Sequence, residues 1–220
     1  MQVQSIGLVL VAVCACSGSA AAQTDSTSEL IIRTYNVADV TRQSVMVAEA
    51  AAAQALRAAG IGIIWRRCGM TNGPISQSND TCGDVLRPRE LVIRMVVAPP
   101  RFADPDTLGY SFVDLSTQRG TLGTIFADRI RAFALEVRKE EGELLGLAIA
   151  HEVGHMLLGT DRHSQKGLMK GHWLPNDRLD SVFTAQQAVQ MRVGLIARDP
   201  IHLVVAPKMG SDLESRQESR

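Results

Sequence analysis

The sequence has no excess of charge of either sign, because 23 Lys and Arg residues balance 23 Asp and Glu residues. A chain without net charge has no general electrostatic attraction for nucleic acid or for an anionic membrane surface, so the charge balance indicates neither partner. Internal repeats and an internal domain linker are also lacking. The composition, 45% hydrophobic and 21% charged, is instead typical of one globular domain with a single core.

No charged residue precedes Asp25. An apolar run over residues 6–16 is followed by small residues that end at Ala22, which is the pattern of a signal peptide. We therefore predict a signal peptide over 1–22 and a secreted, periplasmic or extracellular protein. The first residues contain no Lys or Arg, and the uncharged stretch is almost long enough to span a bilayer, so a retained membrane anchor is the alternative.

Cysteine is scarce, with four in the chain. Cys14 and Cys16 lie in the N-terminal segment, where residues 13–16 loosely resemble a lipoprotein-processing site, and lipidation is a further alternative. Cys68 and Cys82 flank a segment rich in Gly, Asn, Ser and Asp, and an even pair in an exported protein predicts a disulfide. A structural metal site is the competing interpretation, but this separation without an intervening His does not match the usual spacing of zinc ligands.

Apolar periodicity predicts alternating strands and helices after the leader. Residues 30–37 are rich in Ile and Val and predict a strand, Thr41 can cap a helix that Gly60 ends, and 61–66 predict a second strand. A strand, a helix and a strand with short connections form a βαβ unit whose two strands pair in parallel. The first half of the chain is therefore predicted to be α/β.

Further elements are predicted in the second half. The strands are 90–97, 110–115 and 121–127, and the helices are 128–140, 143–158 and one that Thr184 caps and that runs through 195. Residues 210–220 are polar and charged and predict a disordered tail.

The residues that carry chemistry lie on the predicted helix 143–158. His151 and His155 are four positions apart, so they lie on one face of the helix and can turn toward a single metal ion. Glu152 faces the neighbouring side, where it can reach a water on the open position of that ion. This H-E-x-x-H pattern is the zinc-binding motif of metallopeptidases. Zinc lowers the pKa of a bound water to about 7, and we predict Glu152 as the general base that removes its proton.

A catalytic zinc site takes three protein ligands, and the segment after the helix offers Asp161 and His163. Gly159 allows the helix to end and the chain to turn back, because Gly readily adopts the left-handed conformation. We choose His163 as the third ligand and keep Asp161 as the alternative. Some other zinc peptidases take the third ligand from a later helix. Asp177 or Asp180, which lie near a later helix start, could bind zinc in that way, although a helix cap is the simpler role for both.

This segment resembles the metzincin clan of zinc peptidases, whose signature is HExxHxxGxxH or HExxHxxGxxD followed by a methionine-containing turn. The resemblance covers mainly residues 147–173. Leu158 stands at the family's glycine position, Gly159 comes one residue late, Asp161 stands at the third-ligand position, and His163 lies two residues further on. The resemblance implies a zincin-like α/β (α+β) domain over 23–209, with a mixed twisted sheet packed on an active-site helix and a small C-terminal helical part.

Residues 163–169 resemble a shortened metzincin methionine turn, which implies that Met169 lies under the metal; by itself Met169 would be an ordinary core residue. Many metzincins place a Tyr after this turn, but Tyr35 and Tyr110 are the only tyrosines. That role is vacant or filled differently, and His172 is a candidate donor to a developing oxyanion. Zinc peptidases of this architecture hold substrate along an edge strand, for which 121–127 is our candidate.

The leading hypothesis is an exported, monomeric zinc metallopeptidase with His151, His155 and His163 as ligands, Glu152 as base, and a peptide or protein as substrate. The missing Tyr and the shortened turn support an alternative, an exported zinc-binding protein with the same fold and little or no turnover. A membrane-tethered or lipidated form would make contact with a membrane without changing this chemistry.

Overall fold

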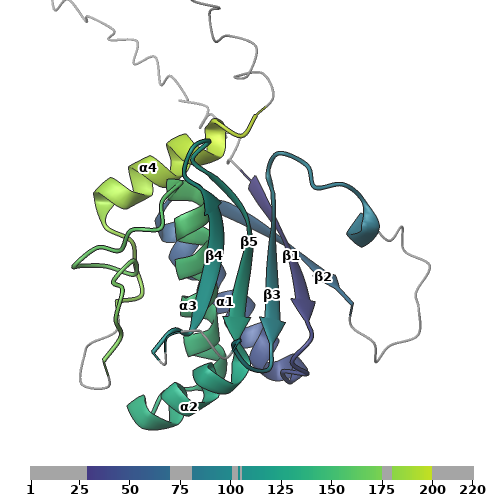
Figure 1. The fold of residues 1–220 in the computed structure, drawn as a ribbon, viewed down its shortest axis with the longest axis vertical. Coiled ribbons are helices and arrows are strands. Elements are labelled where there is room, and N and C mark those ends of the chain that lie inside the picture. The colour runs from purple at the N-terminus through teal and green to yellow at the C-terminus, as the bar shows by residue number, and fades with distance from the viewer. Residues whose placement is uncertain (1–28, 70–80, 101–103, 105, 175–179, 200–220) are drawn as a thin grey trace, which may run out of the picture.

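The computed structural model describes residues 29–69, 81–100, 104, 106–174 and 180–199. The predicted signal peptide, the predicted tail and Asp177 lie outside these residues, so those assignments stay predictions. Within the described residues, the chain forms one twisted sheet with helices α1 and α3 packed behind it, as Figure 1 shows. Within the same residues, no helix is long and apolar enough to cross a membrane.

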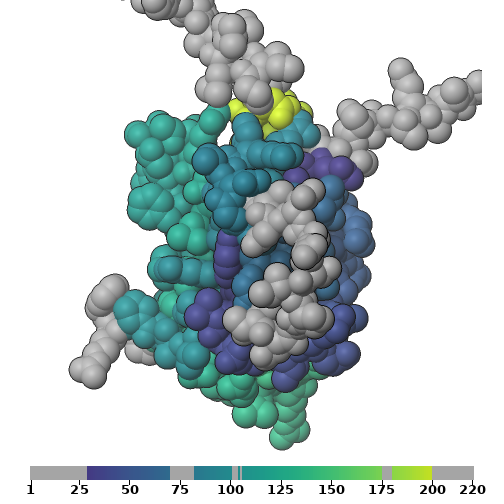
Figure 2. Space-filling model, turned by 90° about the vertical axis from the view of Figure 1, so that its right-hand side faces the viewer, coloured from purple at the N-terminus to yellow at the C-terminus, as the bar shows by residue number. Residues whose placement is uncertain are grey.

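The sheet has five strands in the order β2-β1-β3-β5-β4. The strands are β1 (Glu29–Asn36), β2 (Gly62–Cys68), β3 (Glu90–Val96), β4 (Gly109–Asp114) and β5 (Arg119–Phe126). β2, β1, β3 and β5 pair in parallel, and β4 pairs antiparallel with β5. Helix α1 (Arg42–Ala58) connects β1 to β2, which confirms the predicted βαβ unit and the α/β fold class. Seen from the β2 edge in Figure 2, the purple and blue residues of this unit lie together on the surface.

The prediction that strand 121–127 forms the edge of the sheet was wrong. β5 pairs with β3 on one side and with β4 on the other, so β4 is the edge strand. The burial patterns give the physical reason. Residues 123–126 of β5 are all buried, as in a strand covered on both faces, whereas residues along β4 alternate between intermediate and exposed. β5 therefore fits only the interior of the sheet.

Helix α3 (Glu141–Leu158) is buried along most of its length, from Leu144 to Leu157. It packs against α1, where small residues allow close approach: a Cβ added at Gly146 would collide with the backbone of Ala48. A helix that is buried on nearly every side must be apolar nearly all round. Its few polar residues therefore need partners within the protein.

The predicted caps at Thr41 and Thr184 and the predicted stop at Gly60 are confirmed, whereas the helix predicted over 128–140 ends at Val137. Thr41 caps α1 through a hydrogen bond from the Ser44 backbone N–H of 3.1 Å, and Gly60 follows the helix with a φ of 81°. Thr184 caps α4 (Ala185–Ile196) in a capping box with Gln187. The other helices are α2 (Ala127–Val137) and the short 3₁₀ helix η1 (Thr81–Gly83).

The predicted disulfide between Cys68 and Cys82 is present, with the two Cα atoms 5.8 Å apart. Arg33, which is buried in the sheet, donates hydrogen bonds to the backbone oxygens of Cys82 at 3.2 Å and Asp84 at 2.7 Å. Its guanidinium also forms a buried ion pair with Glu90. The disulfide and this cation together fix the segment at η1 to the sheet.

Glu90 generates a prediction about acid stability. Burial by itself would raise the pKa of Glu90, but hydrogen bonds from the Arg87 N–H and the Arg33 guanidinium outweigh it, so the pKa lies below its ordinary value of 4.5. A carboxyl with a lowered folded-state pKa stabilises the fold above its unfolded-state pKa, and this contribution is lost as the pH falls from 4.5 through the folded value. We expect Glu90→Gln to lower the free energy of unfolding by about 3 kcal/mol at pH 7, because Arg33 stays buried without its anion.

Urea unfolding at pH 7 and at pH 3 measures this effect, and the difference between wild type and Glu90→Gln should shrink at the lower pH. Asp128→Asn is the control, because Asp128 pairs with Arg131 on the surface at 3.4 Å and surface pairs contribute at most about 1 kcal/mol. Equal effects of the two substitutions at pH 7 would contradict the prediction.

Candidate metal centre

Three polar residues interrupt the buried apolar stretch 144–157 of α3. His151, Glu152 and His155 have exposed fractions of only 8%, 5% and 5%. His151 and His155 lie one helical turn apart, as their spacing predicts, with ring centroids separated by 4.8 Å. Ionisable groups this deep in a core need specific partners, because the loss of water is otherwise uncompensated.

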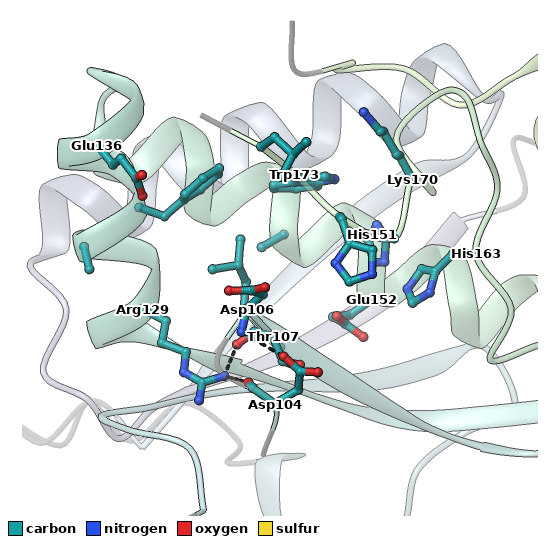
Figure 3. A pocket seen from close by; sticks show the side chains of 18 residues that line it. Asp104, Asp106, Thr107, Arg129, Glu136, His151, Glu152, His163, Lys170 and Trp173 are labelled. Atoms are coloured by element: carbon teal, nitrogen blue, oxygen red, sulfur yellow. Dashed lines mark hydrogen bonds between the residues drawn. The ribbon is translucent and has the colours of Figure 1, made fainter. Parts of the chain in front are cut away.

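His163 joins the two helical histidines from the segment that follows α3. The helix ends at Gly159, which has a φ of 64°, and the chain turns back as predicted. Nε2 of His155 lies 3.1 Å from Nε2 of His151 and 3.2 Å from Nε2 of His163. Among the described residues, these three form the one cluster with metal-ligand spacing. Figure 3 shows His151 and His163 facing each other beside Glu152.

Backbone carbonyls determine which nitrogens face the centre of the cluster. Nδ1 of His151 lies 2.8 Å from the Leu168 oxygen, and Nδ1 of His155 lies 2.8 Å from the Thr160 oxygen. A carbonyl oxygen only accepts, so each Nδ1 carries the proton and each neutral ring presents an unprotonated Nε2 to the centre. Two lone pairs at this distance repel each other unless a cation lies between them.

Two of the three nitrogen pairs of the donor set have the spacing that zinc requires, and all three ligand atoms lie within 4.8 Å of one another. Two imidazole nitrogens bound to one tetrahedral zinc at about 2.0–2.1 Å would be about 3.3 Å apart, close to the 3.1 Å and 3.2 Å found here. Backbone partners on the second ring nitrogen are also the usual way in which a metal-binding His is oriented. Three protein ligands leave one tetrahedral position without a protein ligand, as in catalytic rather than structural zinc sites.

The electrostatics of the cluster keep its histidines neutral. Burial, with a contribution from nearby His155, lowers the pKa of His151 to about 3. Burial also lowers the pKa of His155 and of His163. Neutral imidazole is the form that binds metal, so at neutral pH no proton has to be displaced.

Glu152 lies beside the cluster and points toward β4. Burial raises its pKa to about 7, against the opposing effect of a hydrogen bond from the Ser111 hydroxyl. Ser111 comes from the edge strand, and a Cβ added at neighbouring Gly109 would lie 3.2 Å from Oε1 of Glu152. Our sequence reasoning missed Ser111. In the sequence, Ser111 is only a small polar residue in a short predicted strand. That feature does not indicate that its hydroxyl contacts Glu152.

The alternatives for the third ligand are not part of the cluster. Asp161 is exposed and is not part of the cluster. Asp180 accepts a hydrogen bond of 2.9 Å from the backbone N–H of Gly167 and so holds the turn that precedes Met169. The structure therefore brings His163, and neither of these carboxylates, to His151 and His155.

The predicted methionine turn packs directly beneath α3. Met169 is buried, and a Cβ added at Gly154 would lie 2.5 Å from its Sδ and 2.9 Å from Cε1 of Phe183. The turn is closed by a hydrogen bond of 2.9 Å from the Ser164 N–H to the Met169 oxygen. Met169 thus supports the helix between Glu152 and His155, while neighbouring Leu168 orients His151.

A cavity of about 450 Å³ opens beside the histidines and is lined by His151, Glu152 and His163. Trp173 stands edge-on to His151, with ring centroids 5.8 Å apart and an angle of 87° between the planes. His172, the candidate oxyanion donor, is exposed and also lines the cavity. No Tyr does so among the described residues: Tyr110 bonds to Arg94 and Tyr35 to the Cys82 oxygen.

The chain was compared with protein-family models, curated sequences and solved structures, and only solved structures are similar to it. No protein-family model and no curated protein sequence matches the chain. A solved structure of a zinc-dependent peptidase from Methanocorpusculum labreanum (strain Z) is similar, with a TM-score of 0.50 and 12% identity, over 73% of this chain and 99% of that chain. An archaemetzincin from Methanopyrus kandleri matches with a TM-score of 0.47 and 14% identity, over 79% of this chain and 99% of that one. The first likeness shows that the chain has a fold found in a zinc-dependent peptidase.

The packing of Gly154 on Met169 leads to a stability prediction. Gly154→Ala should lower the free energy of unfolding by about 1–3 kcal/mol, because the added methyl overpacks the site. Urea unfolding of the metal-free chain measures this. Gly83→Ala is the matched control, since a Cβ added at Gly83 meets nothing within 4 Å. If Gly154→Ala is as stable as Gly83→Ala, Met169 does not support the helix in the way described.

Proposed function

We propose that the protein is an exported zinc-dependent metallopeptidase, in which His151, His155 and His163 bind zinc and Glu152 is the general base. One observation carries this proposal: unprotonated Nε2 atoms converge beside a buried carboxylate at the wall of an open cavity. The fold similarity to a zinc-dependent peptidase supports the same conclusion independently of the motif.

The chain's own groups divide the work of hydrolysis. Zinc, when bound, supplies a Lewis acid that polarises the peptide carbonyl and acidifies water. Glu152 takes the proton of the attacking water at its carboxylate. A nearby cation lowers the pKa of a carboxyl, so a loaded site would keep Glu152 ionised. The Ser111 hydroxyl orients the carboxylate.

Export forms part of the proposal. The disulfide between Cys68 and Cys82 is the type of bond that persists in oxidising compartments and supports a location outside the cytoplasm. The signal peptide over 1–22, the peptide or protein substrate and the monomeric state remain predictions. The alternative function, zinc binding with little turnover, is favoured by the absence of Tyr from the described cavity lining.

Metal analysis tests the ligand set. The chain from residue 23 onward should contain close to one zinc per molecule, and His163→Ala should lose most of it because one of three nitrogens is removed. Asp161→Ala is the matched control and should retain zinc, since Asp161 lies outside the cluster. Elemental analysis after dialysis gives the stoichiometry. Zinc lost from Asp161→Ala and retained by His163→Ala would reverse the assignment.

Substitution of the proposed base separates the peptidase from a zinc-binding protein. Glu152→Gln should keep its zinc and lower kcat for peptide hydrolysis by at least about 100-fold, because the amide cannot accept the proton of water. Glu143→Gln, the same change at the half-buried start of α3, where Glu143 pairs with Lys139, should leave kcat unchanged. The peptidase mechanism is refuted if Glu152→Gln, loaded with zinc, hydrolyses peptides at the wild-type rate.

A further inference from the structure

The third histidine of the cluster is held in a different way from the other two. Nδ1 of His151 and Nδ1 of His155 each lie 2.8 Å from a backbone oxygen, which fixes the two rings. His163 is exposed, and within the part of the chain that the structure describes its ring has contacts with the other histidines but no such carbonyl partner. Its position must therefore come from the backbone beside it and from packing against the ring.

The contact that fixes this backbone comes from helix α4. We propose that Gln187 is a positioning residue for His163, and that it acts through Ser164, the residue that follows this ligand in the chain. Gln187 itself does not touch the metal. The inference rests on the proposed zinc site and deepens it, because it gives α4 a role in metal binding.

The amide of Gln187 is engaged at both of its ends. The side chain has an exposed fraction of 8%. Its Oε1 accepts a hydrogen bond of 2.9 Å from the Thr184 N–H, as part of the capping box that begins α4. Its Nε2 donates a hydrogen bond of 2.9 Å to Oγ of Ser164. A Glu would complete the same capping box but has no N–H to donate. The cap alone therefore does not require Gln, whereas the bond to Ser164 does.

Ser164 passes this restraint to the turn that contains His163. Its hydroxyl donates to the Lys166 oxygen at 2.7 Å, and its backbone N–H donates to the Met169 oxygen at 2.9 Å. With the bond from Gln187, three hydrogen bonds hold the residue adjacent to the ligand. A ligand whose backbone is already fixed loses less conformational entropy when the metal binds, and this preorganisation raises affinity.

Two further hydrogen bonds join the same turn to the segment before α4. The Gly167 N–H donates to Oδ2 of Asp180 at 2.9 Å, and the Leu168 N–H donates to the Val182 oxygen at 2.8 Å. The segment 180–187 thus also fixes Leu168, whose carbonyl orients His151. The contact of Gln187 differs from these two because it is made at the residue next to the third ligand.

Packing orients the ring of His163 itself. A Cβ added at Gly171 would lie 2.8 Å from Cγ and 3.0 Å from Nδ1 of His163, so the backbone of Gly171 lies directly against the imidazole. Atoms this close to the root of a side chain cannot move without moving the ring. Gly171 therefore orients the ring, while Ser164 and Gln187 fix the backbone from which the ring extends.

Metal affinity, measured without any peptide, tests the role of Gln187. The Kd of the metal-free protein for Zn²⁺ is determined by competition with a chelating dye, and the absorption spectrum of bound Co²⁺ reports the coordination geometry. Ser164→Ala and Gln187→Glu should each raise this Kd about 10-fold, as expected when a residue that orients a metal ligand is lost. Ser164→Thr keeps the hydroxyl and should bind Zn²⁺ as the wild type does.

A double variant and matched controls make the test specific. Ser164→Ala combined with Gln187→Glu should bind Zn²⁺ no more weakly than either single variant, because both changes remove the same hydrogen bond. Gly171→Ala should weaken binding as well, since the added methyl displaces the ring. Gln186→Glu, on the exposed face of α4, and Ser116→Ala, in the exposed turn between β4 and β5, should leave the Kd unchanged.

Urea unfolding of the metal-free variants distinguishes positioning from a purely structural role. Variants that are less stable but have the wild-type Kd for Zn²⁺ and the wild-type Co²⁺ spectrum overturn the proposal, as do additive effects in the double variant. Ser164→Ala decides the matter if Gln187→Glu does not fold. If the wild type binds zinc without cleaving any peptide, and Ser164→Ala weakens that binding, the positioning role stands and the peptidase falls. A wild type that binds no zinc overturns both.

Discussion

The burial of three polar side chains in one apolar helix is the constraint on which the rest of this structure depends. His151, Glu152 and His155 lie in α3 with little access to water, and each has a partner that compensates for its burial. The partners come from two segments: the Leu168 and Thr160 carbonyls from the turn after α3, and the Ser111 hydroxyl from β4. The turn after α3 and the edge strand β4 must therefore lie where they do, or the helix would contain unsatisfied polar groups.

Small residues make that arrangement sterically possible. Gly146 allows α3 to approach α1, Gly154 admits Met169 beneath the helix, and Gly109 leaves space for the Glu152 carboxylate. Each glycine removes a side chain at a point where two elements meet closely. The same helix thus combines an apolar surface for packing with a polar face that opens on the cavity, and packing holds the polar face in position.

The orientation of the imidazoles links this packing to function. Because backbone carbonyls hold the Nδ1 protons of His151 and His155, their Nε2 atoms are available without rearrangement. A preorganised set of neutral nitrogens next to a buried carboxylate suits metal-assisted hydrolysis, and the fold is one found in a zinc-dependent peptidase. The absence of Tyr from the described cavity lining distinguishes the cavity from the metzincin pattern. His172 lines the cavity and has a side chain that can donate a hydrogen bond, as that Tyr does.

Local features of this protein could be predicted from the sequence alone. The pairing of His151 with His155, the end of α3 at Gly159, the caps at Thr41 and Thr184 and the βαβ unit all follow from interactions within a few residues or from short connections. The disulfide followed from the number and context of the cysteines. Within the part of the chain that the structure describes, periodicity located every strand to within a few residues, because burial imposes it locally.

Only the tertiary structure decided the order of the strands and the surroundings of Glu152. Whether His163 or Asp161 lies close to His151 and His155 depended on the path of a turn whose glycine comes one residue late, because neighbouring side chains in a turn point in different directions. The edge position of β4, the contact of Ser111 with Glu152 and the position of α2 beside the cavity join residues that are distant in sequence. Such contacts depend on how whole elements pack, and a pattern of residue types along the chain does not specify that packing.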